Sequence, residues 1–301
     1  MFNIDQFQRT NIHTSDTTQL ISAQQVILFH HFRKLLEHAR EMHIDVAPLK
    51  GAHLLTSVYP ASESRGAMVD IDFLVQEHDW HRIPLLMNAC GFSPVFIPSR
   101  HATQAKFHEA HYVHRFDAQT QIVFEPHRQF VQLARHPIDY SQVWQRSYQS
   151  TFEGVSCLRI CDDDHFLHQV IHLFSHRFAE PVRGLKDMEM LWRNGDVNFS
   201  NVSRRAGEWK CRNALWLSLV LHKHIFATNS FDSLIEETMP SRFIRFALTK
   251  LVSPEHGFRF TGAGLRIEEA TLWPFLMDDI HQGIGFMADY AKLRLKDLFS
   301  D

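Results

Sequence analysis

Two aspartates stand inside an apolar, β-branched stretch of this 301-residue chain, V-D-I-D-F-L-V from Val69 to Val75. Such a stretch predicts a strand, on which residues two apart share one face at a spacing of about 6.5–7 Å. Asp70 and Asp72 would then point the same way, while Ile71 and Phe73 face a core. Apolar residues on both sides of the pair favour a central strand, with a solvated edge strand as the alternative.

Two carboxylates held side by side repel each other unless a cation lies between them. Carboxylate oxygens on a rigid strand suit Mg²⁺ or Mn²⁺. Two such ions about 3.5–4 Å apart form the usual clamp for in-line phosphoryl or nucleotidyl displacement. The aspartate pair therefore predicts a divalent-metal site.

A lysine and a glycine, Lys50 and Gly51, lie one predicted helix upstream, between a strand candidate over Val46 to Leu49 and a helix over Ala52 to Tyr59. Glycine at such a turn lets backbone N–H groups approach a phosphate, and the helix N-terminus attracts anions. Lys50 would add a point charge for a triphosphate. Arg65, in the loop before the aspartates, would bind phosphate or neutralise the first of them.

The first half of the chain alternates helix and strand, and the second half is helical. Helices are predicted over Thr18 to Met42 and Asp79 to Cys90, and strands over Tyr112 to Phe116 and Gln121 to Glu125. From about Asp162 strand signals fade, and helices are expected over residues 163–178, 181–193, 200–209, 212–227, 240–251 and 272–299. The pattern predicts an α+β chain.

These features resemble the DNA polymerase β-like nucleotidyltransferase superfamily, above all its uncharacterised bacterial branch, which carries L-K-G followed by R-x-x-x-x-D-I-D-x-L-V. The matching residues are Lys50-Gly51, Tyr59-Pro60, Arg65 and Asp70 to Val75. The resemblance implies a mixed sheet with flanking helices, plus a C-terminal all-helical domain. We expect a catalytic domain over residues 1–155 and a helical domain over 156–301 that closes the cleft.

The resemblance also implies a third carboxylate, which Glu125 supplies within F-E-P-H-R-Q-F. Pro126 departs from the branch, whose motif is like E-L-H-W. Because proline removes a donor from the strand ladder, we expect the strand to end or bulge at Glu125. A salt bridge from Glu125 to Arg128 or Arg115 is the alternative role.

The activity implied is transfer of a nucleoside monophosphate from an NTP, expected to be ATP, to an acceptor hydroxyl, with release of pyrophosphate. Asp70, Asp72 and Glu125 would be the catalytic carboxylates and would hold two Mg²⁺ or Mn²⁺ ions. The nucleotide would be bound by Lys50, Gly51 and Arg65. The same cleft is expected to be lined by His127, His172, His176, Lys186 and Asp187.

Histidine is unusually frequent, with 22 residues in 301. One helical stripe contains His165, His168, His172 and His176. Zinc ligation and a zinc hydrolase are alternatives for these residues, and packing at a domain interface is the simpler interpretation. The segment His108-Glu109-Ala110-His111 is one residue short of the H-E-x-x-H zinc motif, and His111 is expected on the surface or in the cleft lining.

The net charge and composition of the chain bear on the class of acceptor and on the location of the protein. The net charge is −3, and no basic tract interleaved with aromatic residues occurs, which argues against long DNA or RNA as acceptor. A small molecule, a peptide or a protein hydroxyl is expected instead. Without a signal peptide or membrane span, and with four cysteines, the chain is expected to be cytoplasmic and reduced. The alternative function, favoured by Pro126, is a degenerate nucleotidyltransferase fold that binds a nucleotide or a partner.

Overall fold

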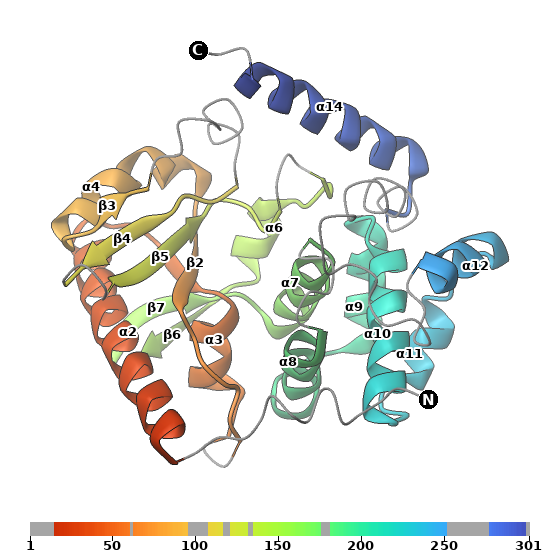
Figure 1. The fold of residues 1–301 in the computed structure, drawn as a ribbon, viewed down its shortest axis with the longest axis horizontal. Coiled ribbons are helices and arrows are strands. Elements are labelled where there is room, and N and C mark those ends of the chain that lie inside the picture. Colours follow the sequence, from red (N-terminus) through yellow and green to blue (C-terminus); the bar gives the residue numbers. More distant parts are fainter. Residues whose placement is uncertain are drawn as a thin grey trace. The chain divides into compact units, whose positions relative to one another are not determined.

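The computed structural model describes residues 15–60, 63–95, 108–116, 121–131, 135–175, 181–251 and 277–298. The chain divides into two compact units (Figure 1). The sheet unit contains the described residues up to 131 together with 140–161. The helical unit contains 135–139 and the described residues from 162 onward.

A mixed five-stranded sheet forms the centre of the sheet unit. Its strand order is β1-β2-β5-β4-β3, where the strands are β1 (Val46–Pro48), β2 (Asp70–Val75), β5 (Gln121–His127), β4 (Tyr112–Arg115) and β3 (Ser93–Pro94). β2 pairs antiparallel with β1 and parallel with β5. Both edges of β2 are therefore occupied, and the prediction of a central strand for the two aspartates is confirmed.

Helix α2 (Ser15–Glu41) supplies much of the core of this unit. Its Phe32 is fully buried and contacts Phe73 of β2 and Phe124 of β5, with ring centroids 5.6 and 5.9 Å away. Because side chains alternate along a strand, Phe73 and Phe124 direct their neighbours Asp72 and Glu125 to the opposite face of the sheet. The aromatic core thus fixes which face carries the acids.

The helix predicted over Asp79 to Cys90 is two elements, a 3₁₀ helix η1 (Glu77–Arg82) and α4 (Ile83–Ala89). Pro84 lies in the first turn of α4, where its missing N–H costs nothing and its fixed φ suits a helix start. The proline therefore begins a helix here. The helices predicted over Thr18 to Met42 and Ala52 to Tyr59 are α2 and α3 (Lys50–Ser57).

A hairpin that was not predicted follows α6 (Tyr140–Gln145). It consists of β6 (Tyr148–Phe152) and β7 (Val155–Arg159). Glu153 and Gly154 have φ of 48° and 80°, which gives a two-residue turn of the type that suits strand twist. Phe152 is fully buried against α2. Each strand has only five residues and mixes polar with apolar side chains, which hid both strands in the sequence.

The helical unit confirms the prediction of a helical second half. Its helices are α7 (Asp162–Ser175), α8 (Pro181–Asn194), α9 (Phe199–Glu208), α10 (Arg212–Phe226), α11 (Asp232–Glu237), α12 (Arg242–Leu251) and α14 (Ile280–Leu298). Buried Asp164 and Arg205 pair at 2.9 Å between α7 and α9. Across the described residues, none of the helices combines the length and apolarity that a membrane crossing requires.

Candidate active site

Asp72 and Glu125 are direct neighbours on two parallel strands. The register of β2 and β5 pairs Asp72 with Glu125, and Leu74 with His127. Asp70 lies two residues before Asp72 and so shares its face. The fold therefore brings the three carboxylates of the sequence prediction to one face of the sheet.

The expectation that the strand ends or bulges at Glu125 is wrong. β5 continues through Pro126 to His127, and Pro126 keeps its pairing with Phe73. The carbonyl of Pro126 accepts from Ala110 N at 3.0 Å. In such a pair, the N–H and C=O of one residue face the same neighbouring strand. The backbone nitrogen of Pro126, which carries no hydrogen, therefore faces Ala110 and not β2. The hydrogen bonds between β5 and β2 are unaffected.

An extended segment at residues 108–111 prolongs the register of β4 beside the end of β5. Tyr112 pairs with Phe124, and Glu109 forms an isolated bridge to His127 in the same register. This register also places His111 opposite Glu125. Glu109 and His111 therefore point to the same face as the carboxylates.

Asp72 is buried and lies between two donors. Lys50 Nζ lies 2.6 Å from Asp72 Oδ1, and His127 Nε2 donates to the same oxygen at 2.9 Å. Burial raises the pKa of the Asp72 carboxyl, but the charge of Lys50 and the hydrogen bond from His127 outweigh it and hold that pKa well below its usual range. Asp72 is thus a carboxylate with a compensated charge.

Asp70 has the opposite character. Burial, followed by the charges of Asp72 and Glu125, raises the pKa of Asp70 to about 6, and Lys50 and Arg65 offset this only in part. The carboxylates therefore repel one another at neutral pH, and a divalent cation would relieve that repulsion.

Three imidazoles surround Glu109. Its Oε2 lies 3.1 Å from His108 Nε2 and 3.6 Å from His127 Nε2, and its Oε1 lies 3.5 Å from His111 Nε2. His111 also donates from Nδ1 to Glu125 Oε1 at 2.8 Å. These hydrogen bonds to Glu109 and Glu125 raise the pKa of His111 to about 10, so the ring is charged at neutral pH.

The start of α3 approaches this face closely. Lys50 has φ of 43°, in the left-handed region that non-glycine residues rarely adopt. A Cβ at Gly51 would lie 2.6 Å from Met68 Sδ and 2.8 Å from Arg65 Nη1. A side chain at this position would therefore displace the ends of Arg65 and Met68 from the first turn of α3, where no side chain caps the helix.

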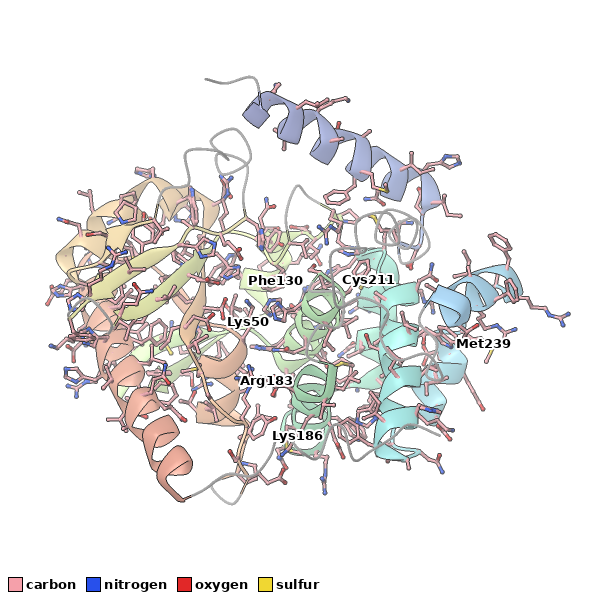
Figure 2. All side chains as sticks on the ribbon, in the orientation of Figure 1. Lys50, Phe130, Arg183, Lys186, Cys211 and Met239 are labelled. Atoms are coloured by element: carbon pink, nitrogen blue, oxygen red, sulfur yellow. The ribbon has the colours of Figure 1, made fainter. Side chains whose placement is uncertain are left out.

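The predicted residues fall into two groups. The sheet unit holds Lys50, Gly51, Arg65, Asp70, Asp72, Glu125 and His127. The helical unit holds His172, half-buried on α7, and Lys186 and buried Asp187 on α8; Lys50 and Lys186 can be located in Figure 2. His176 lies outside the described residues.

Sequence reasoning missed Glu109 and understated His108 and His111. The signal was the H-E-A-H segment. It does not match the helical zinc motif, but in an extended segment Glu109 and His111 point to the same face because Ala110 lies between them. Arg128, considered above as a partner of Glu125, instead has Glu77 as an ion-pair partner at 3.3 Å.

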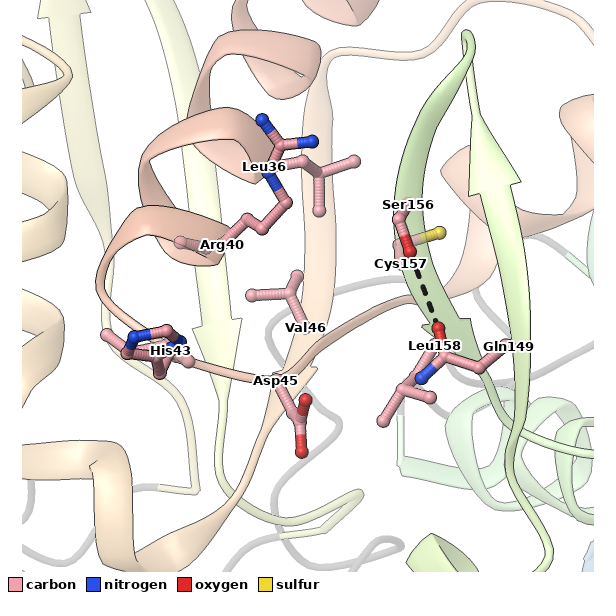
Figure 3. A pocket seen from close by; sticks show the side chains of 11 residues that line it. Leu36, Arg40, His43, Asp45, Val46, Gln149, Ser156, Cys157 and Leu158 are labelled. Carbon is pink, nitrogen blue, oxygen red and sulfur yellow. Dashed lines mark hydrogen bonds between the residues drawn. The ribbon is translucent and has the colours of Figure 1, made fainter.

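Two groups of described residues could hold a metal ion, Asp72–Glu125–His127 and His108–Glu109–His127, each with ligand atoms within 4.8 Å of one another. A separate pocket of about 280 Å³ lies between the end of α2, β1 and the β6–β7 hairpin (Figure 3). None of its lining residues belongs to the two groups.

Comparison with known proteins agrees with the nucleotide chemistry expected from the motif. The sequence model of a family described as uncharacterised nucleotidyltransferase matches residues 8–227. This match spans the whole carboxylate face and continues into α10. No curated protein matches the chain.

Proposed function

Because the chain belongs to this uncharacterised nucleotidyltransferase family, we propose that it moves a nucleoside monophosphate from an NTP to an acceptor hydroxyl and releases pyrophosphate. The observation that carries the proposal is the pairing of Asp72 with Glu125 on adjacent parallel strands, with Asp70 two residues away. In-line nucleotidyl transfer needs such a group of carboxylates on a rigid support.

Asp70, Asp72 and Glu125 are the residues that would hold Mg²⁺ or Mn²⁺. Their oxygen donors suit these hard cations, and the raised pKa of Asp70 indicates a local excess of negative charge. When bound, the ions would neutralise phosphate charge and polarise the α-phosphate.

Lys50, the first turn of α3 and Arg65 would bind the triphosphate, for which we favour ATP. Lys50 Nζ lies 2.6 Å from Asp72 Oδ1 and compensates the charge of that carboxylate. A metal ion bound to Asp72 would free the ammonium group of Lys50 for a phosphate oxygen. The uncapped N–H groups of α3 offer further donors to an anion. Because Gly51 has no Cβ, it leaves room for the guanidinium of Arg65 close to those donors.

Glu125 is the candidate proton acceptor for the attacking hydroxyl. In the metal-free protein His111 keeps its own proton at neutral pH, which favours Glu125 over this imidazole as the base. His111 instead holds Glu125 in place through the 2.8 Å hydrogen bond. A small molecule, a peptide or a protein side chain would supply the hydroxyl.

The alternative of a degenerate, binding-only protein depended on a strand interrupted at Pro126. β5 continues past this residue and keeps Glu125 in register with Asp72, so that support is lost. We therefore favour catalysis.

The test is Mg²⁺-dependent pyrophosphate release with each NTP, together with mass spectrometry of candidate acceptors and of the protein itself. Asp70→Asn alone, and combined with Asp72→Asn, should reduce transfer by at least a hundredfold while the circular dichroism spectrum is kept. Asp45→Asn is the matched control, because Asp45 is an exposed acid of the same unit. Unchanged transfer in the double variant would refute the proposal.

A further inference from the structure

Glu109 is surrounded by imidazoles. Within the described residues, each of its ion-pair partners is a histidine: His108, His111 and His127. Its side chain is 22% exposed and that of His127 only 1%. A carboxylate this far withdrawn from water needs a counter-charge, and in the metal-free protein the protonated ring of His111 supplies it.

The distances in this group match the edges of a coordination polyhedron. Ligand atoms bound at about 2.0–2.2 Å to one ion lie about 3.0–3.6 Å from one another. Glu109 Oε2 lies 3.1 Å from His108 Nε2 and 3.6 Å from His127 Nε2. The two imidazole rings converge at 5.4 Å between centroids with an interplanar angle of 62°, so that they are not stacked.

We propose that His108, Glu109 and His127 bind a divalent first-row transition-metal ion, typified by Zn²⁺, beside the carboxylates of β2 and β5. Two nitrogens and one carboxylate favour Zn²⁺ or its neighbours over Mg²⁺, which prefers oxygen ligands. The site therefore differs in donor chemistry from the all-carboxylate group of Asp70, Asp72 and Glu125. In the metal-free protein His127 Nε2 donates to Asp72 Oδ1 at 2.9 Å, so a bound ion would replace that proton. The site does not depend on the proposed nucleotidyl transfer.

The surroundings indicate an exchangeable ion. His111 lies 3.5 Å from Glu109 Oε1 and 2.8 Å from Glu125 Oε1, so it orients the ligand carboxylate from outside. The Nδ1 atoms of His108 and His127 have no hydrogen-bond partner among the described residues. Tightly held zinc ligands usually have such outer partners, and we therefore expect weaker, reversible binding.

The experiment is a Co²⁺ titration of the metal-free full-length protein without an affinity tag, followed by visible absorption. We expect saturable d–d bands at one Co²⁺ per chain, displaced by Zn²⁺ and not by equimolar Mg²⁺. His108→Gln and Glu109→Gln should each weaken Co²⁺ binding at least tenfold. His108 is on the rim of the group, with 17% exposure, so its variant is expected to fold, and a thermal melt checks this.

Two controls separate this site from other histidines and from the proposed active site. His38→Gln removes an exposed histidine whose ion-pair partner is Glu41, at 3.6 Å, and this variant should leave Co²⁺ affinity unchanged. Asp70→Asn should keep Co²⁺ affinity within about threefold even where it abolishes transfer. The proposal is overturned if no bands appear, if His108→Gln binds Co²⁺ normally, or if binding depends on Asp70.

Discussion

Lys50 Nζ lies 2.6 Å from Asp72 Oδ1, and the two side chains are only 15% and 5% exposed. Breaking a buried pair by removing one partner costs about 3–5 kcal/mol, because a charge is left uncompensated. Lys50→Met should therefore lower the free energy of unfolding by roughly that amount in metal-free protein. Mg²⁺ should restore part of the loss, since it replaces the missing positive charge.

Urea unfolding with and without Mg²⁺ measures this effect. Lys223→Met is the matched control: Lys223 pairs with Asp232 at 2.7 Å, but both side chains are more than 40% exposed, at 46% and 42%. An exposed pair contributes about 0–1 kcal/mol. Equal losses in the two variants would show that Lys50 does not compensate a buried charge.

Asp70→Asn should stabilise the metal-free protein at neutral pH. A carboxyl whose pKa is raised to about 6 in the folded state destabilises that state at pH values above 6, and the penalty disappears below the unfolded pKa of about 4. The gain should reach at most about 2 kcal/mol at pH 7.5 and vanish near pH 3.5. Differential scanning fluorimetry at both pH values provides the measurement.

The same variant should lose the Mg²⁺-induced rise in Tm, which the wild-type chain should display. In the wild-type chain the bound ion relieves the repulsion between the carboxylates, whereas in the variant the neutral side chain has already removed it. A variant that is less stable than wild type at pH 7.5 would contradict the excess of negative charge inferred at Asp70.

Pro126→Ala should be close to neutral for stability. The substitution restores an N–H that faces Ala110, whose own N–H already bonds to Pro126 O, and one such bond contributes about 0.5–1.5 kcal/mol. Loss of the proline ring adds unfolded-state entropy of similar size and opposite effect. A net change below about 1 kcal/mol with normal activity is expected from urea unfolding and the transfer assay; a large gain in activity would mean that proline does disturb Glu125.

His136 should make the helical unit sensitive to acid. Burial, and then the charge of Arg135, lowers its pKa to about 3, and its Nδ1 bonds to Trp209 O at 3.1 Å. The unfolded chain takes up a proton below pH 6.5 and the folded chain does not, so stability falls as the pH drops from 6.5 toward 3. By pH 5 this amounts to about 2 kcal/mol.

His136→Asn keeps a donor near Trp209 O without the titrating ring. Its free energy of unfolding should therefore change less than that of wild type between pH 7.5 and 5. His281→Asn, which alters an exposed histidine at the start of α14, should keep the wild-type slope. Identical slopes in all three proteins would refute the role of His136.

The strand of Asp70 and Asp72 could be predicted because side-chain alternation is a local property. The apolar neighbours of the pair revealed a strand paired on both edges, as β1 and β5 confirm. The hairpin β6–β7 mixes polar and apolar residues in two strands of five residues each, without a continuous apolar stretch like the one around Asp72, and was missed.

Glu109 could not be found in this way, because its place depends on pairing with His127, 18 residues later. Register between segments so far apart is set by the turn and the core together. The prediction at Pro126 was wrong for a related reason. The residue type shows that the backbone N–H is missing, but only the strand register shows that this position faces Ala110 and not β2.

The row formed by Asp72, Glu125 and His111 across three neighbouring chain segments has a consequence for how this family can change. Substitutions can exchange any one of these groups and leave the others in place. An insertion or deletion of one residue ahead of them in β5 would instead turn Phe124 and Pro126 to the polar face and Glu125 and His127 into the aromatic core. We therefore expect insertions and deletions in related sequences to fall outside β5.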